Sequence, residues 1–239
     1  NWVSGTGATF NTNSMDALSG SVTEFFANAG MTLNGSGLNA QAGSQFKFGV
    51  NAWLDIHGIF NTYGTPSSNV LFYPTNPSAK WYGLHVNSNG ATCSVNYADF
   101  SYAYYGIFIE SSRMFLNDSR ARYCDYGIFV ANLTHPKMAV SIQRSTTEYN
   151  NTPQFYSYGI KAQNSRYLTL RDNTIANNFY GVVIDQGSTA RMYGNQINNN
   201  WFGVSAENGS DLRMGDMIVG DYGNNCASKN SSTVVNVVS

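Results

Sequence analysis

Charged residues are scarce in this 239-residue chain: Lys, Arg, Asp and Glu together make up 11% of it, and its formal net charge is −1. No run of like charges occurs in the sequence. A protein that follows a nucleic-acid backbone needs clustered Lys and Arg side chains to neutralise the phosphates. We therefore expect no nucleic-acid partner.

Long apolar runs are also missing. No stretch approaches 18 consecutive apolar residues and no basic leader precedes an apolar segment, so the sequence predicts neither membrane insertion nor a visible signal peptide. The first residue is Asn1 rather than Met. We interpret residues 1–239 as one domain cut from a longer exported protein, located outside the cell or on its surface.

Cysteine is rare as well. Cys93, Cys124 and Cys226 have spacings that match no zinc or redox motif, so we expect them to be small buried apolar side chains. Neither a metal site nor a cofactor is expected.

Asparagine and glycine are abundant, with 30 and 23 copies, and many of them belong to a repeat. An aromatic–Gly–aliphatic pattern occurs as YGLHV (82–86), YGIFI (105–109), YGIFV (126–130), YGIKA (158–162), YGVVI (180–184) and FGVSA (202–206). Its glycines, at 83, 106, 127, 159, 181 and 203, are separated by steps of 23, 21, 32, 22 and 22. A period of about 22 residues with one insertion of about ten explains these steps.

The residues after each glycine alternate as they do in a strand. The first and third are apolar, as in Val182 and Ile184, while the second and fourth vary freely. Two further short apolar alternations follow in each period, separated by Asn, Gly and Ser. Three short strands per period, each lying on its counterpart one period later, predict an all-β fold, a parallel β-helix solenoid of about ten coils.

Stacked coils give the repeated residues structural roles. The glycine takes a bend that a side chain would obstruct, and the aromatic residue before it stacks on the aromatic residue of the next coil. Asn173 and Asn195 occupy the same offset, so we expect their amides to hydrogen-bond as a ladder. Functional residues are therefore expected where the sequence departs from the repeat.

Residues 163–206, which include NSRYLTLRDNTIANNFYGVVI and ARMYGNQINNNWFGVSA, resemble the repeats of right-handed parallel β-helix proteins of the pectate-lyase-like superfamily, especially the NosD-type group. The segments MTLNGSGLNAQAGSQFKFG (31–49), WLDIHGIFNTYGTPSSNVLFYP (53–74) and KWYGLHV (80–86) are similar to the leading coils of large secreted β-helix proteins of Bacteroidota. The resemblance implies a right-handed β-helix. It does not select an activity, because the superfamily spans lyases, hydrolases, epimerases, tailspikes and adhesins.

The acidic pair nearest to a catalytic or cation site is Asp185 and Glu207, expected on adjacent coils about 5 Å apart, beside Gln163 and Lys161. The pair could hold a cation or act as nucleophile and acid. The alternative is two solvated side chains with no enclosing charge partner. The Asn-x-Asp, Asp-Asp, Gly-His-Gly and Arg-x-Lys segments of the pectin hydrolases are absent, so no catalytic residue is assigned.

Two insertions, 131–137 and 150–158, account for the long step and flank the outward residues Phe108 and Phe129. Together with Tyr156, the two Phe rings form a candidate platform for stacking against sugars. The alternative is that the loops fold down and bury both rings.

The remaining polar candidates are an arginine cluster and two histidines. The cluster consists of Arg113, Arg120, Arg122 and Asp118. It could bind an acidic sugar, but salt bridges within one coil are favoured. His85 and His135 have no carboxylate or Cys at triad spacing, so we expect hydrogen-bonded surface residues.

The chain ends in a β-prone segment, SSTVVNVVS (231–239), so either further sequence follows or this edge pairs end to end with another copy. The sequence favours a non-catalytic module of an exported or cell-surface protein that serves as stalk, adhesin or glycan-binding surface. The alternative is a lyase or glycoside hydrolase that acts on an acidic polysaccharide. The candidate substrate-binding residues are Phe108, Phe129, Lys161, Asp185, Glu207 and Tyr156.

Overall fold

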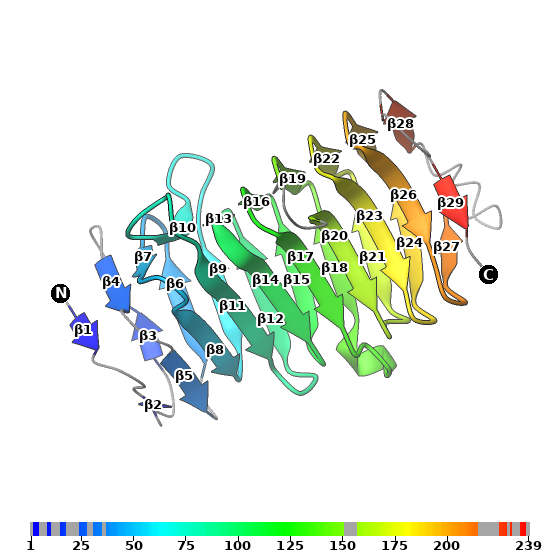
Figure 1. Ribbon diagram of the computed structural model, residues 1–239. Coiled ribbons are helices and arrows are strands. Elements are labelled where there is room, and N and C mark those ends of the chain that lie inside the picture. The colour runs from blue at the N-terminus through cyan, green and yellow to red at the C-terminus, as the bar shows by residue number, and fades with distance from the viewer. Residues whose placement is uncertain are drawn as a thin grey trace.

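The computed structural model describes residues 2–4, 9–10, 15–17, 24–27, 31–34, 37–150, 157–214, 225–228, 230 and 235–237. These residues form three parallel β-sheets that run the length of a solenoid, with strands progressing from β1 at one end to β29 at the other (Figure 1). Each strand pairs with the strand three places later in the chain, so the chain passes through the three sheets in turn. We call them sheets A, B and C, after the order in which β1, β2 and β3 enter them.

Sheet A contains ten strands. They are β1 (Trp2–Ser4), β4 (Glu24–Ala27), β7 (Gln45–Phe48), β10 (Val70–Pro74), β13 (Ala98–Ser101), β16 (Arg120–Arg122), β19 (Thr146–Glu148), β22 (Thr174–Ala176), β25 (Gln196–Asn198) and β28 (Cys226–Ser228).

Sheet B also contains ten strands. They are β2 (Thr9–Phe10), β5 (Met31–Asn34), β8 (Trp53–His57), β11 (Trp81–Asn87), β14 (Ala103–Glu110), β17 (Tyr126–Ala131), β20 (Tyr158–Gln163), β23 (Tyr180–Asp185), β26 (Phe202–Ala206) and β29 (Val235–Val237).

Sheet C contains nine strands. They are β3 (Met15–Ala17), β6 (Leu38–Gln41), β9 (Phe60–Tyr63), β12 (Thr92–Asn96), β15 (Arg113–Asn117), β18 (Val140–Gln143), β21 (Leu168–Arg171), β24 (Thr189–Tyr193) and β27 (Asp211–Arg213). A short 3₁₀ helix, η1 (Pro136–Met138), lies in the insertion before β18. Among the described residues, no helix is long and apolar enough to cross a membrane.

The all-β parallel solenoid predicted from the repeat is confirmed. It has about eight turns, slightly fewer than the ten or so expected from dividing the whole chain by its period. Short strands at the two ends, β1–β4 and β28–β29, extend the sheets beyond these turns to ten, ten and nine strands.

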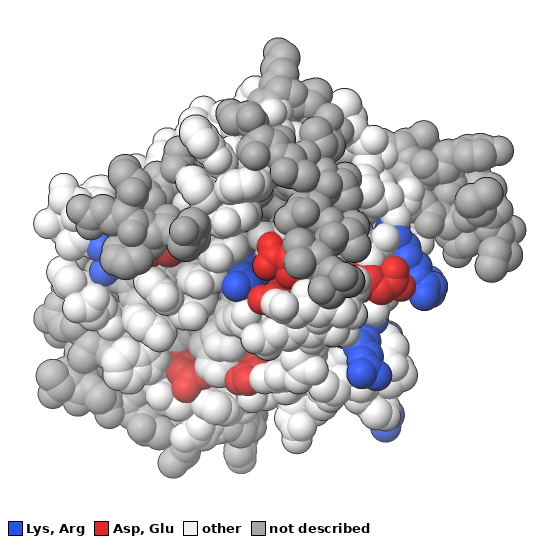
Figure 2. Space-filling model, turned by 45° about the vertical axis from the view of Figure 1, so that its right-hand side comes forward, with Lys and Arg blue, Asp and Glu red and all other residues white. Residues whose placement is uncertain are grey.

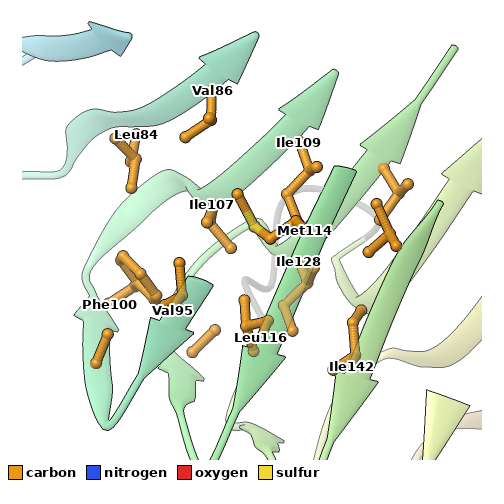
Figure 3. Packing of buried hydrophobic residues seen from close by; sticks show 14 of the residues in the cluster. Leu84, Val86, Val95, Phe100, Ile107, Ile109, Met114, Leu116, Ile128 and Ile142 are labelled. Carbon is orange, nitrogen blue, oxygen red and sulfur yellow. The ribbon is translucent and has the colours of Figure 1, made fainter. Parts of the chain in front are cut away.

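The interior is formed by the first and third residues after each repeat glycine, as the alternation predicted. All twelve of these side chains are at most 2% exposed. In Figure 3, Leu84 and Val86 of β11, Ile107 and Ile109 of β14 and Met114 of β15 are among the side chains packed inside the coils. Complete burial of one such aliphatic side chain stabilises the fold by about 1.5–3 kcal/mol.

The predicted aromatic stack is present on sheet B from the second repeat onward, but the first repeat departs from it, because Tyr82 stacks on Tyr104 and meets Tyr105 edge-on. Its members are Tyr105, Tyr126, Tyr158, Tyr180 and Phe202, and successive ring centroids are 4.9, 4.9, 5.0 and 4.8 Å apart. The glycine after each ring is needed because neighbouring coils approach closely. A Cβ atom on Gly181, for example, would lie 2.4 Å from the carbonyl oxygen of Gly203.

The predicted asparagine ladder is also present. The Asn173 side-chain amide donates to Oδ1 of Asn195 at 2.9 Å, and Asn195 donates to Asn225 at 2.7 Å. A second ladder, which the sequence reasoning missed, joins Asn178 to Asn200 at 3.0 Å and continues to residue 230. Both ladders also hydrogen-bond backbone N–H and C=O groups at the turns, which would otherwise be buried without partners.

The arginine cluster forms ion pairs between coils, which corrects the expectation of pairs within one coil. Asp99 of β13 accepts from Arg120 at 2.7 Å and from Arg122 at 3.0 Å, both on β16 of the next coil. Arg144 likewise reaches Asp118 of the preceding coil at 2.7 Å. Strands of adjacent coils lie about 4.8 Å apart, closer than residues i and i+2 on one strand, so partners on adjacent coils are nearer.

The cysteines follow the expectation in part. Cys93 and Cys124 are buried free thiols, and burial raises the pKa of the Cys124 thiol to about 12. Cys226 is exposed, contrary to expectation, because it begins β28 near the end of the described solenoid.

Candidate functional site

The outward-facing residues of sheet B form a column whose chemistry changes along the solenoid. In coil order the column contains Asp55, His85, Phe108, Phe129, Lys161, Val183 and Ser205. Polar and charged residues therefore meet aromatic ones at β8, β11 and β14. Figure 2 shows that, among the described residues on one face of the molecule, charged groups are few and that several Lys or Arg groups adjoin Asp or Glu groups.

A groove of about 600 Å³ lies over these three strands. Its lining includes Trp53, Asp55, Tyr82, His85, Tyr105 and Phe108. Trp53 and Tyr82 are 45% and 50% exposed, although large aromatic side chains usually lie inside a protein. The groove therefore presents aromatic surface to solvent next to a polar group.

The groove occupies the position of a missing ring in the aromatic column. By register, Trp53 of β8 lies opposite Gly83 of β11, and Gly83 lies opposite Tyr105 of β14. Each coil from Tyr105 to Phe202 contributes a ring to this column, whereas Gly83 contributes none. Trp53 and Tyr105 are thus two coil spacings apart, about 10 Å, which leaves room for one further ring between them.

The backbone at Gly83 requires glycine. Its φ is +131°, a conformation that side chains disfavour, and a Cβ atom there would lie 2.0 Å from the carbonyl oxygen of Tyr105. The register between β11 and β14 shifts between Gly83 and Leu84, as in a β-bulge. Bulges redirect side chains and often lie next to functional sites.

A hydrogen-bond network of acidic and histidine side chains lies along one side of the groove. Nδ1 of His85 lies 2.8 Å from Oδ1 of Asp55, and its Nε2 lies 3.1 Å from Oε2 of Glu110. His57 contacts the other oxygen of Asp55 at 2.9 Å. Asn132, from the insertion after β17, donates to Glu110 at 2.7 Å.

Charge on His85 and Asp55 is stabilised by this geometry. Burial lowers the pKa of His85, but the contacts with Asp55 and Glu110 outweigh burial, and the net pKa lies above its ordinary 6.5. Burial raises the pKa of Asp55, but hydrogen bonds with His85 and His57 outweigh burial, and the net pKa lies below its ordinary 3.8. Because each ring nitrogen of His85 faces a carboxylate, the imidazolium with two N–H donors is the favoured form.

The sequence candidate Phe108 lies in this groove. Its ring is partly exposed and stacks on the His85 ring, with centroids 4.5 Å apart. Phe129 is only 8% exposed, which corrects its assignment to an exposed platform. It packs against Tyr105, Phe108 and Tyr126, so neighbouring aromatic rings cover the faces that a sugar would need.

Lys161 and Asp185 form a buried ion pair rather than an exposed site. Their charged atoms are 3.7 Å apart, and Lys161 also lies over the Tyr158 ring. Burial raises the pKa of Asp185, but hydrogen bonds from Asn208 and Gln163, with the nearby Lys161 charge, make the net pKa lower than usual. The expectation that Asp185 is solvated and has no charge partner is wrong, because it is 7% exposed.

Glu207 accepts a hydrogen bond from Ser205 of its own coil at 2.6 Å. No group of three or more His, Cys, Asp or Glu side chains within the described residues has the geometry to hold a metal ion. Tyr156 lies outside the described residues. His135 accepts from the backbone N–H of Lys137 in η1, as a hydrogen-bonded surface residue would.

Sequence reasoning missed the network around His85 and the exposed rings Trp53 and Tyr82. It treated His85 as a lone histidine, because Asp55 and Glu110 are 30 and 25 residues away in the chain. Alignment of WLDIH (53–57) with GLHVN (83–87) places Asp55 beside His85. These segments are 30 residues apart, more than the period of about 22, so the repeat does not reveal this alignment.

No curated protein and no solved structure matches the chain significantly. The family model for the right-handed β-helix region matches residues 78–238, which include most of the groove and every regular coil after it. The match covers about two thirds of the chain and agrees with the three parallel sheets. The chain belongs to the right-handed β-helix family.

Proposed function

We propose that this chain is a non-catalytic glycan-binding module and that the groove over β8, β11 and β14 is its binding site. The observation that carries the proposal is the gap in the aromatic column between Trp53 and Tyr105. A pyranose ring has flat apolar faces that stack on aromatic rings and hydroxyl groups that need hydrogen-bond partners. The rings of Trp53 and Tyr105 on either side of the gap supply the aromatic surfaces, and the carboxylate of Asp55 supplies hydrogen-bond acceptors.

The rigidity of the site supports binding. All six aromatic and polar lining residues named above belong to strands that are paired on both sides. Little conformational entropy is lost when such a site takes up a ligand, so more of the contact energy appears as affinity. The same regular scaffold is suited to act as a stalk.

A non-catalytic role is supported by the lowered pKa values of the carboxyl groups of Asp55 and Asp185. A glycosidase needs a carboxyl group that stays protonated near neutral pH, which requires a raised pKa. Asp55 and Asp185 both have lowered pKa values, because each accepts hydrogen bonds from neighbouring side chains. Neither is suited to donate a proton to a leaving group.

The test is titration calorimetry with a panel of oligosaccharides, using a matched pair of exposed tryptophans. Trp53→Ala is expected to weaken glycan binding about tenfold or more, since truncation of a central aromatic contact costs about 2 kcal/mol or more. Trp201→Ala is the control, because Trp201 is 55% exposed and lies at the far end of the same solenoid. Equal affinities of the Trp53→Ala variant and the unmodified chain would refute this site.

One observation favours a second candidate, a polysaccharide lyase or glycoside hydrolase. His85 lies between two carboxylates beside the groove and has a raised pKa, so it could donate a proton. The assay measures new reducing ends or unsaturated products with acidic and neutral polysaccharides, with and without calcium. Turnover that is lost in His85→Gln would establish the enzyme and refute the non-catalytic role.

Three finer assignments also remain proposals. The Asn-rich repeat at 163–206 supports a NosD-type relationship, and the coils at 31–86 support a relationship to secreted Bacteroidota proteins. The scarcity of charge and the regular polar ladders are consistent with an extracellular or cell-surface module. End-to-end contacts between copies are supported by parallel sheets that end at β28 and β29, and light scattering over a wide range of concentrations tests them.

A further inference from the structure

We propose that the groove selects glycans by charge: it prefers an oligosaccharide that carries protonated amino groups, accepts neutral sugars less well and rejects uronic acids. This inference rests on the proposed glycan-binding function and names the ligand class of the same site. It differs from the acidic polysaccharide that the sequence suggested for an enzyme.

The charges around the groove carry this inference. Asp55 and Glu110 contribute two negative charges and His85, which lies between them, one positive charge, so these three groups carry a net charge of −1. His57 contacts the second oxygen of Asp55 and does not line the groove. Among the described residues that line the groove, none is Lys or Arg. A uronate would therefore have no unpaired cation to bind.

The hydrogen bonds within the network also favour a cationic ligand over an anionic one. Both ring nitrogens of His85 are directed at carboxylates, so its N–H groups are not free to bind a ligand anion. A carboxylate oxygen has two lone pairs and can accept a second hydrogen bond. The Asp55 and Glu110 side chains keep 22% and 26% of their surfaces exposed, so they can accept from ammonium or hydroxyl groups.

The aromatic rings likewise favour a cationic ligand over an anionic one. An ammonium group over the face of an aromatic ring is attracted by the negative charge of that face, whereas a carboxylate in the same place is not. Trp53 and Tyr82 offer exposed rings of this kind beside Asp55. A sugar ring held between Trp53 and Tyr105 would bring its substituents close to both the rings and the carboxylates.

The experiment compares tetramers of β-1,4-linked glucosamine, β-1,4-linked glucose and α-1,4-linked galacturonate by titration calorimetry at about pH 6.5, below the raised pKa of His85. We expect glucosamine to bind about three- to fivefold more tightly than glucose, the range that one partly exposed charge pair supplies. Galacturonate should bind at least threefold more weakly than glucose. Raising the ionic strength should reduce both differences, because salt screens exposed charges.

Two variants of the same network shift the preference in opposite directions. Glu110→Gln removes one negative charge, so the glucosamine preference should fall about threefold. His85→Gln removes the positive charge, so that preference should rise by a similar factor. Structural damage to the network would change both variants in the same direction, which separates it from the effect of charge.

Asp211→Asn is the matched control for net charge. Asp211 is half-exposed, begins β27 and pairs with Arg213, far along the solenoid from the groove. This variant should leave the ranking unchanged, because salt screens charges beyond about 8–10 Å.

Galacturonate binding as tightly as glucose or more tightly would overturn the charge selection but leave the groove as a glycan site. A ranking that is the same in Glu110→Gln and His85→Gln would also overturn it. Failure of all three tetramers to bind would overturn the proposed function itself.

Discussion

The aromatic column of sheet B differs between its two halves. From Tyr105 to Phe202 it has a ring on every coil, and the rings are packed against one another and against their neighbours. Between Trp53 and Tyr105 the column lacks a ring, and the groove lies at that position. The same repeat can therefore produce either a closed structural stack or an open site, depending on whether one coil contributes a side chain.

The interiors of the two regions differ in a similar way. The coils near the groove are filled by stacked aromatic rings, such as Phe46, Phe72 and Phe100, with centroids 4.6 and 5.0 Å apart. The later coils instead contain aliphatic side chains and the two asparagine ladders. Each ladder has one step of 22 residues followed by one of 30, so the ladder residues keep their positions although the turns between them differ in length.

The largest expected effect comes from substituting a glycine of the aromatic–Gly–aliphatic repeat in the regular region. Gly181→Ala would place a Cβ atom 2.4 Å from a backbone oxygen of the next coil, and backbone has little freedom to move. We expect the free energy of unfolding in urea to fall by about 3 kcal/mol. Gly187→Ala is the control: its site is open and only its φ of +67° is unfavourable, so about 1 kcal/mol is expected. Equal losses in the two variants would contradict close coil packing.

A second substitution tests the asparagine ladder. Asn200 is fully buried, donates to Asn230 and to the backbone of Ile175, and accepts from Asn178. Asn200→Ala leaves several buried polar groups without partners, so we expect a loss of about 2 kcal/mol in unfolding free energy.

The control for the ladder is Gln196→Ala, an exposed position on β25 of the same coil. It should change the unfolding free energy by less than about 0.5 kcal/mol. If Asn200→Ala were as mild as this control, the ladder would have no stabilising role.

The smallest expected effect is the pH dependence of the stability that the hydrogen-bond network of His85 and Asp55 contributes beside the groove. His85 has a folded pKa above 6.5, so its contribution to stability is complete below pH 6.5 and is lost as pH rises through the folded pKa. Asp55 has a folded pKa below 3.8, so its contribution is present above pH 3.8 and is lost as pH falls through the folded pKa. Both contributions are complete only between these two values.

We therefore expect His85→Gln to reduce the unfolding free energy by about 1 kcal/mol between about pH 4 and 6.5, and by less at higher pH. Urea unfolding of both proteins across this range measures the difference. A difference that grows above pH 7 would contradict the ion-paired state of His85. Asn200→Ala, which touches no titratable group among its described partners, should show no such dependence.

The regular region could be predicted closely from the sequence because each coil repeats its neighbour. Inward and outward positions, the ring stack and the Asn173 ladder all follow from aligning one period on the next. The ladder through Asn178 and Asn200 obeys the same rule and was missed only because the adjacent asparagines were treated as turn residues.

The groove could not be predicted in the same way. Asp55 and His85 meet only because two coils of unequal length are in register, and sequence spacing alone does not fix that register. The burial of Phe129 depends on rings from three different positions, which a residue pattern does not specify. Prediction therefore succeeded where coils are alike and failed where they differ.

The most direct test of the central claim uses the indole N–H signals of the four tryptophans in a proton–nitrogen correlation spectrum. The indole of Trp53 lines the groove, that of Trp81 is buried and donates to Ser101, and that of Trp201 lies exposed at the other end. Titration with the glucosamine tetramer should shift the Trp53 signal in a saturable manner and leave the Trp201 signal in place. A Trp53 signal that does not move with any of the three tetramers, or a shift confined to Trp201, would contradict a binding site at the gap in the aromatic column.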